Sequence, residues 1–280
     1  MLSMLARGPG LLTVFCFLLG CARLPEQKAE LPLQPARMSA DSVVLDIFFV
    51  RCPPADERLN CELWDEVDEQ RLPAETRRRL WANGFRVGLV YGQIPVALSQ
   101  LLELTDKPAP SGDTIVENEL SSLEAEPTVM RRHLQARPGR RNEIVASPVY
   151  DSLPVLISEQ GEVRGRTYRQ AQGMLALTAI PQPDGRVRLS LVPELHYEQA
   201  RQRWVGRQGM LQMETSRPRH TFDDMGFSAD FMPGDLLVLT CLPNRPGSLG
   251  HNYFTTPEGE PTQKLLVIRL AQTQHNGIVP

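Results

Sequence analysis

Histidine and carboxylate side chains that could act together in acid–base or metal chemistry occur at two places in the sequence. Glu194 and His196 are two residues apart, so on a β-strand their side chains would share a face and could pair. His220 is followed by Asp223 and Asp224, and the three could collect a cation or exchange protons. Neither place has the His-x-x-x-His or His-Glu-x-x-His spacing of a helical metal site. We therefore expect a surface Glu–His contact at the first place and a polar loop between strands at the second.

Other residue types that carry enzyme chemistry lack the neighbours that the chemistry requires. Ser248 lies in Gly-Ser-Leu-Gly, which is not the Gly-x-Ser-x-Gly of a nucleophile elbow, and the nearby prolines favour a turn. No Gly-x-x-x-x-Gly-Lys phosphate loop occurs. Trp64 and Trp81 fall in helical stretches, where we expect them in the core or at a domain interface. We expect no catalytic residue, metal or cofactor; the alternative is an exported, hydrolase-like enzyme with a site in the loops of residues 217–235.

The first twenty residues have the layout of a secretory signal peptide. Arg7 is their only charge, residues 11–19 form an apolar run with one polar member, Thr13, and the small Gly20 precedes Cys21. A short basic start, a short apolar core and a small residue at the cleavage point are typical of such signals. The run is about half of the ~20 residues needed to span a bilayer, so a permanent transmembrane helix is not expected.

Residues 18–21, Leu-Leu-Gly-Cys, resemble the lipobox of bacterial lipoproteins. In that family the cysteine is acylated, for example with palmitate, and becomes the new N-terminus, so the resemblance implies lipid attachment at Cys21. The alternative is an ordinary secretory signal with a chance cysteine. Two or more acyl chains would anchor the protein stably, whereas one holds it only marginally. Residues 21–40 contain three prolines and several charges, which predicts an extended tether.

Three cysteines follow Cys21: Cys52, Cys61 and Cys241. Export permits disulfides, and a bridge between Cys52 and Cys61 would leave Cys241 free and buried in a strand. The alternative is three reduced, buried thiols, since sequence spacing alone does not establish the geometry of a bridge. No Cys-x-x-Cys pair of a zinc site is present.

Composition limits the classes of function. The formal net charge is −3, and it becomes −4 once Arg7 is removed with the signal, which argues against a general nucleic-acid or anionic-lipid surface. Hydrophobic residues make up 41% of the chain, enough to bury a core. The mature chain would be long enough for two modest domains or one larger one.

Residues 41–104 show the pattern of a small α/β unit. Residues 41–50 are dense in β-branched and aromatic side chains, which predicts a buried strand. Apolar residues four apart predict an amphipathic helix over residues 55–70. Pro73 and the pair Asn83-Gly84 are typical start and stop signals of a second helix. A strand at 85–91 and a helical stretch at 95–102 complete the unit.

Residues 105–126 are rich in proline, small and acidic residues, and we expect a linker there. From residue 127 onward the pattern is β. Val187, Leu189 and Leu191 alternate with polar residues, as in a half-buried antiparallel strand. Strands are expected at 128–136, 143–146, 155–158, 163–168, 174–180, 186–192, 236–242 and 265–270. The sequence thus predicts an α+β fold: a small α/β unit followed by a larger antiparallel β domain, 127–280.

Two segments of the β region resemble the β domain of bacterial secretins, the outer-membrane ring proteins of pili and type II/III secretion. Residues 180–194 (IPQPDGRVRLSLVPE) are similar to the secretin strand–turn–strand, and residues 233–239 (PGDLLVL) to a later strand. Residues 246–250 match only a fragment of the glycine- and proline-rich secretin signature. The resemblance implies a secretin-like β domain, and the departures argue against a complete gated channel.

These patterns predict a non-enzymatic, membrane-anchored lipoprotein of the bacterial envelope that is a structural or assembly component of a secretion- or pilus-type system. Its expected partners are the membrane, through the anchor at Cys21, and envelope proteins or copies of itself. We expect neither nucleic acid nor a small-molecule ligand. The face of Arg186, Arg188 and Ser190 on the strand at 186–192 is a candidate contact surface.

Overall fold

The computed structural model describes residues 42–54, 56–102, 129–159, 161–207, 210–256 and 261–273. The expected signal peptide (1–20), tether (21–40) and linker (105–126) lie outside the described residues, and Cys21 lies outside them as well. Within the described residues, no helix is both long enough and apolar enough to cross a membrane.

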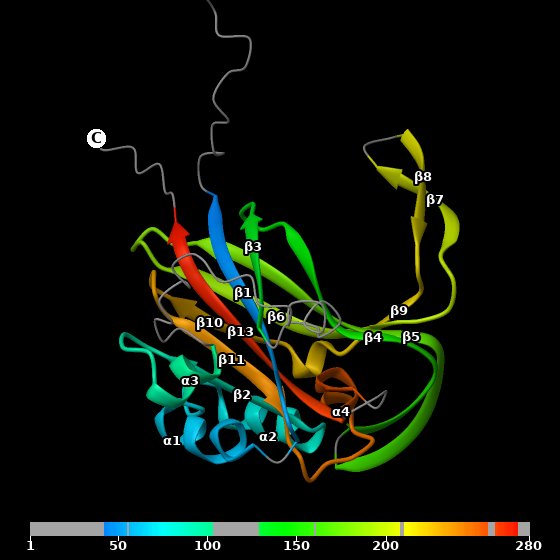
Figure 1. The fold of residues 1–280 in the computed structure, drawn as a ribbon. Coiled ribbons are helices and arrows are strands. Elements are labelled where there is room, and N and C mark those ends of the chain that lie inside the picture. Colours follow the sequence, from blue (N-terminus) through cyan, green and yellow to red (C-terminus); the bar gives the residue numbers. More distant parts are fainter. Residues whose placement is uncertain are drawn as a thin grey trace, which may run out of the picture. The chain divides into compact units, whose positions relative to one another are not determined.

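The fold is mostly β, with antiparallel sheets and few helices (Figure 1). The first sheet has the order β2-β11-β13-β1-β3, with β12 paired to β13. The second has the order β10-β6-β5-β4, with β9 paired to β6, and β7 and β8 form a two-stranded sheet of their own. The strands are β1 (Val43–Cys52), β2 (Phe85–Val90), β3 (Val129–Ala136), β4 (Arg141–Glu159), β5 (Glu162–Pro181), β6 (Val187–His196), β7 (Arg201–Arg207), β8 (Met210–Ser216), β9 (Arg219–Thr221), β10 (Phe227–Phe231), β11 (Leu236–Cys241), β12 (Thr255–Thr256) and β13 (Thr262–Thr273).

Two hydrophobic cores lie on opposite faces of the first sheet. One contains buried side chains of both larger sheets, together with Leu80 of α2 and Tyr253 of α4. The other is covered by η1, α1 and α3, which contribute Leu59, Trp64 and Leu98. The helices are the π-helix η1 (Arg58–Glu62), α1 (Leu63–Glu66), α2 (Ala74–Ala82), α3 (Val96–Leu101), the 3-10 helix η3 (Asp223–Met225) and α4 (Leu249–Phe254).

Strand β1 explains the apolar run near the start of the described chain, which is interrupted by Asp46. It lies between β13 and β3 and is antiparallel to both. Leu45 and Ile47 belong to the first core, while Phe48 and Val50 belong to the second. A strand that is buried on both faces needs apolar residues at consecutive positions.

The strand pairing differs from the expected division into an α/β unit, 41–104, and a separate β domain, 127–280. β1 pairs with β13 and β3, and β2 pairs with β11. The strands of the expected unit are therefore completed by strands from the later part of the chain. The sequence pattern predicted these strands, but it carries no information about which distant strand provides the hydrogen-bond partners.

Local signals predicted several elements. Helix α2 follows Pro73 and ends at Ala82, Asn83 is its C-cap, and Gly84 has a positive φ of 79°, which confirms the start and stop signals. Instead of one helix over 55–70, the chain forms the short η1 and α1, after which Asp68 pairs with Leu89 of β2. The expected helix was therefore too long.

The alternation in β6 is confirmed, because Val187, Leu189 and Leu191 are all buried, and β5 and β6 form an antiparallel pair. The turn at residues 137–140 is not a hairpin. β3 pairs with β1 in the first sheet, whereas β4 pairs with β5 in the second. This turn therefore links the two sheets.

Candidate functional site

The contact predicted between Glu194 and His196 is present at the end of β6. His196 Nε2 lies 3.0 Å from Glu194 Oε2. The expectation of a surface contact was wrong, because the carboxylate of Glu194 is buried. Arg141 of β4 pairs with this carboxylate and, through Nη1 at 2.5 Å, with Glu143.

The two carboxylates and the imidazole are close enough to share a metal ion. One ligand atom each of Glu143, Glu194 and His196 lie within 4.8 Å of one another. The guanidinium of Arg141 already pairs with both carboxylates. A buried carboxylate requires such a partner, and the arrangement is a satisfied ion-pair cluster that links β4 to β6.

His220 belongs to an aromatic cluster between strands. Its ring stacks on Phe222 with centroids 4.4 Å apart, and its Nδ1 is hydrogen-bonded to the hydroxyl of Tyr168. Burial, followed by the charge of Arg166, lowers the pKa of His220, while burial raises the pKa of Tyr168. Both side chains are therefore neutral near neutral pH, and the phenol donates to the imidazole. Nδ1 of His220 is occupied by this hydrogen bond, and the ring packs against Phe222.

The acids after His220 lie in a short helix next to α2. Asp223 and Asp224 begin the 3-10 helix η3, and the Asp224 carbonyl accepts a hydrogen bond from Arg79 of α2 at 3.2 Å. In the part of the chain that the structure describes, neither acid joins His220 in a group that could hold a metal.

Ser248 caps a helix that the sequence analysis missed. Its hydroxyl accepts from the backbone N–H of His251 at 3.3 Å and donates to the Arg245 carbonyl at 2.6 Å. Serine is a common N-cap residue. The sequence signal for α4 was Ser248 itself, obscured by the prolines that suggested only a turn.

The structure holds Cys52, Cys61 and Cys241 as free thiols, with Cys61 exposed and the other two buried. The structure has no bridge between Cys52 and Cys61, and it also differs from the alternative of three buried thiols, because Cys61 is exposed. Burial raises the pKa of Cys52 to about 11 and that of Cys241 to about 12. Both buried thiols stay protonated and are poor nucleophiles.

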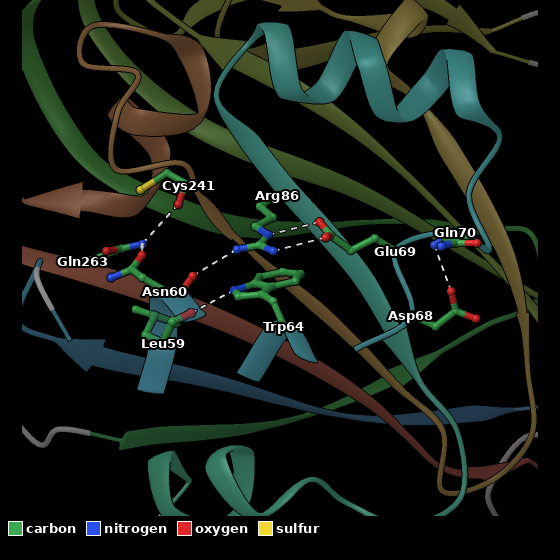
Figure 2. Close-up of polar contacts among 9 residues, drawn as sticks. All are labelled: Leu59, Asn60, Trp64, Asp68, Glu69, Gln70, Arg86, Cys241 and Gln263. Atoms are coloured by element: carbon green, nitrogen blue, oxygen red, sulfur yellow. Dashed lines mark hydrogen bonds and ion pairs between the residues drawn. The ribbon is translucent and has the colours of Figure 1, made fainter. Parts of the chain in front are cut away.

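A polar network anchors the η1–α1 segment to the first sheet (Figure 2). Arg86 of β2 makes two contacts of 3.1 and 3.2 Å with the carboxylate of Glu69, and its guanidinium lies 4.1 Å from the ring centroid of Trp64. Arg86 also donates to the Asn60 carbonyl, and Gln263 of β13 donates to the Asn60 side chain, each at 3.1 Å. Burial of Trp64 is confirmed. The network is internally satisfied and structural.

The surface feature with the clearest capacity for binding is the β7–β8 ribbon, residues 201–216. Trp204 is directly opposite Met213 in the antiparallel register, and Leu211 is two residues before Met213. All three therefore project from one face of the ribbon. Their exposed fractions are 65% for Trp204, 74% for Leu211 and 55% for Met213.

The ribbon is hydrogen-bonded as a strand to neither of the larger sheets, and Figure 1 shows it standing apart from them. A two-stranded hairpin alone is at best marginally stable in water, and grouped exposed apolar side chains mark interaction surfaces. We call the set Trp204, Leu211 and Met213 the apolar ribbon face.

Arg217 fastens the base of the ribbon. Its side chain donates to the carbonyl of Glu198 at 2.9 Å and to that of Gln170. These two acceptors are the non-glycine residues with positive φ, 57° and 47°, in the described chain. Such backbone conformations are costly and persist where neighbouring groups hold them. Arg217 therefore fixes the place where the ribbon leaves the second sheet.

The ribbon was not predicted from the sequence, although Leu211 and Met213 alternate with polar residues and follow Trp204 closely in the chain. The pattern of a strand with one apolar face is the same whether that face meets the core or solvent. The candidate surface of Arg186 and Arg188 is exposed, but Arg188 pairs with Asp230 of β10 through contacts of 2.8 and 3.0 Å.

Comparison of the sequence with protein-family models and with curated proteins finds no match.

Proposed function

We propose that this chain is a non-enzymatic, lipid-anchored protein of the bacterial envelope that works as an assembly component. The observation that carries the proposal is the apolar ribbon face: three large apolar side chains, all more than half exposed, on one side of a ribbon. Leaving such a face in water is unfavourable, and covering it with another protein removes that cost. Binding through the ribbon is the simplest use of this surface.

The proposed anchor and envelope location rest on the sequence. The signal layout and the lipobox resemblance at residues 18–21 support acylation of Cys21 and attachment to an envelope membrane. Anchoring raises the local concentration of the chain, so that a modest apolar face can support a specific contact.

The secretin resemblance supports a place in a secretion- or pilus-type system. Residues 180–194 span the end of β5, a turn and β6, and the two strands are antiparallel. Residues 233–239 include a turn at Gly234 and most of β11. This local structure is compatible with the secretin strand–turn–strand, and we propose a structural role in such an assembly, without a gated channel.

The alternative, an exported hydrolase with a site in residues 217–235, has less support. Arg217 is engaged with two backbone carbonyls, and His220 is bonded to Tyr168. No arrangement of nucleophile, base and orienting group occurs among these described residues that would meet the geometric roles of a catalytic site.

The test is cross-linking with mass spectrometry in the native envelope. A full-length variant with serine at Trp204, Leu211 and Met213 should fold, because exposed substitutions usually change stability by only about 0.5 kcal/mol each. It should lose the cross-links made by the wild type. The control is Val163→Ser, which alters an exposed apolar residue on the β4–β5 hairpin. Identical cross-links in the wild type and the triple variant would overturn the proposal.

The anchor is tested separately by Cys21→Ser. The variant should leave the membrane fraction or accumulate as uncut precursor, and the wild type should carry an acyl mass on its N-terminal cysteine. Identical fractionation and no acyl mass would contradict lipidation.

A further inference from the structure

A second candidate binding surface lies on the exposed side of α2, away from the ribbon residues. It is a hollow of about 460 Å³. We call it the arginine hollow. It is lined by Ala74, Arg77, Arg78, Trp81, Ala82 and Arg245.

The helix forms most of this hollow because its lining residues recur at helical spacing. Positions 74, 77, 78, 81 and 82 fall on one face of an α-helix. Arg245 comes from the turn between β11 and α4. That turn is held against the end of α2, where Gly250 N donates to the Asn83 carbonyl and Leu242 N donates to the Gly84 carbonyl, each at 2.8 Å.

The three arginines of the hollow have no paired carboxylate among the described residues. Among the described residues, none of Arg77, Arg78 and Arg245 forms an ion pair, and Arg77 Nε is buried without a hydrogen-bond partner. The next arginine on the helix, Arg79, pairs with Glu75. A buried donor without a partner is costly, and a carboxylate bound in the hollow would neutralise part of the charge on these guanidinium groups.

Trp81 gives the hollow an apolar wall. The expectation that Trp81 lies in the core or at a domain interface differs from the structure, where 47% of the side chain is exposed. A tryptophan surrounded by guanidinium groups suits a ligand that combines negative charge with an apolar group, because the ring buries apolar area while arginine binds carboxylate.

We propose that the arginine hollow binds an acidic segment of a partner protein, with a carboxylate on the arginines and an apolar side chain against Trp81. The site goes beyond the ribbon contact and uses none of its residues.

The surroundings favour a peptide over an anionic membrane or a nucleic acid. A neighbouring cavity of about 790 Å³ shares Arg78 and is bordered by Glu75, Glu159 and Asp224. An extended anionic surface would meet these acids as well as the arginines, and the chain as a whole carries a net charge of −3. A short acidic segment can engage the arginines alone.

The test measures binding of a fluorescein-labelled peptide of glutamates interspersed with leucines, by fluorescence anisotropy, to the full chain in detergent. Arg245→Glu should weaken binding about tenfold through loss of a charge-assisted contact and added repulsion. Trp81→Ala should also weaken it. The control Arg132→Glu makes the same change of charge at an exposed arginine of β3, which lies at the opposite edge of the first sheet from β2, and should leave binding unchanged.

Several outcomes would overturn the proposal: no binding, equal weakening by Arg245→Glu and Arg132→Glu, or tighter binding of vesicles that contain phosphatidylglycerol through the same residues. The triple serine variant of the ribbon should bind the peptide like the wild type. Failure of the ribbon contact and failure of the arginine hollow are therefore distinguishable. Circular dichroism of each variant shows whether it is folded. Arg245 is a suitable position for substitution because its side chain is exposed and forms no ion pair among the described residues.

Discussion

Replacing Arg217 with methionine should loosen the base of the β7–β8 ribbon and leave the two larger sheets folded. Arg217 donates to the carbonyls of Glu198 and Gln170, and both acceptors have positive φ. Methionine keeps much of the apolar volume of the side chain and removes both donors. The change therefore tests the hydrogen bonds and not the packing.

The magnitude follows from the two bonds. At a half-buried site each is worth about 1 kcal/mol net, and each left-handed residue stores about 1 kcal/mol of strain that the bonds offset. Loss of both should lower the free energy of local opening by about 2 kcal/mol, which is about a 30-fold larger open population. The global free energy of unfolding should change less, because the two hydrogen bonds end on Glu198 and Gln170, which belong to neither hydrophobic core.

Hydrogen exchange measures this opening directly. The amide of Glu198 donates to the Arg169 carbonyl at 2.8 Å, and the amide of Tyr197 donates to the Pro218 carbonyl at 2.9 Å. Both should exchange faster in Arg217→Met. The control Arg201→Met removes only an exposed ion pair with Glu198 and should have little effect. Unchanged exchange at these two amides, or equally fast exchange throughout the β6 strand, would refute the reasoning.

Two further substitutions test the core. Burial, then the charge of Arg51, lowers the pKa of Lys264 to about 8, and its Nζ donates to the Ala146 carbonyl at 2.6 Å. Between that value and the usual pKa of lysine the unfolded chain binds more protons than the folded chain, so the free energy of unfolding should rise with pH through this window. Lys264→Met should therefore stabilise the protein by about 1–2 kcal/mol near pH 7 and by less above pH ~10. Urea unfolding at the two pH values measures this gain, and an equal gain at both would contradict the argument. Gly173→Ala should destabilise the protein by about 2 kcal/mol, because the added Cβ would lie 2.7 Å from the buried ring of Tyr253. The control is Gly165→Ala in the same strand, where the added Cβ meets no atom closer than 3.7 Å. Equal melting temperatures for the two variants would show that the contact with Tyr253 is unimportant.

The elements that could be predicted are those defined by their own residues. Helix α2 was predicted because Pro73 and the pair Asn83-Gly84 bound it locally. The pair Glu194 and His196 was predicted because strand geometry brings residues two apart to one face. Strand β6 was predicted because its alternation reflects burial of one face.

What could not be predicted depends on residues distant in sequence. The carboxylate of Glu194 is paired with Arg141, 53 residues away, so its burial had no local signal. β1 is completed by β13, from the end of the described chain. The arginine hollow needs Arg245 beside α2, and the apolar ribbon face looks like a core strand until its exposure is known.

The most direct test of the assembly role is a photo-cross-linker at the apolar ribbon face of the anchored protein. p-Benzoylphenylalanine in place of Leu211, the most exposed member of that face, should cross-link to a specific envelope protein or to a second copy of the chain when the intact envelope is irradiated. The same group in place of Val163, an exposed apolar residue outside the ribbon, should give no such product. A chain that stays uncross-linked at Leu211 and monomeric in the envelope would contradict the assembly role.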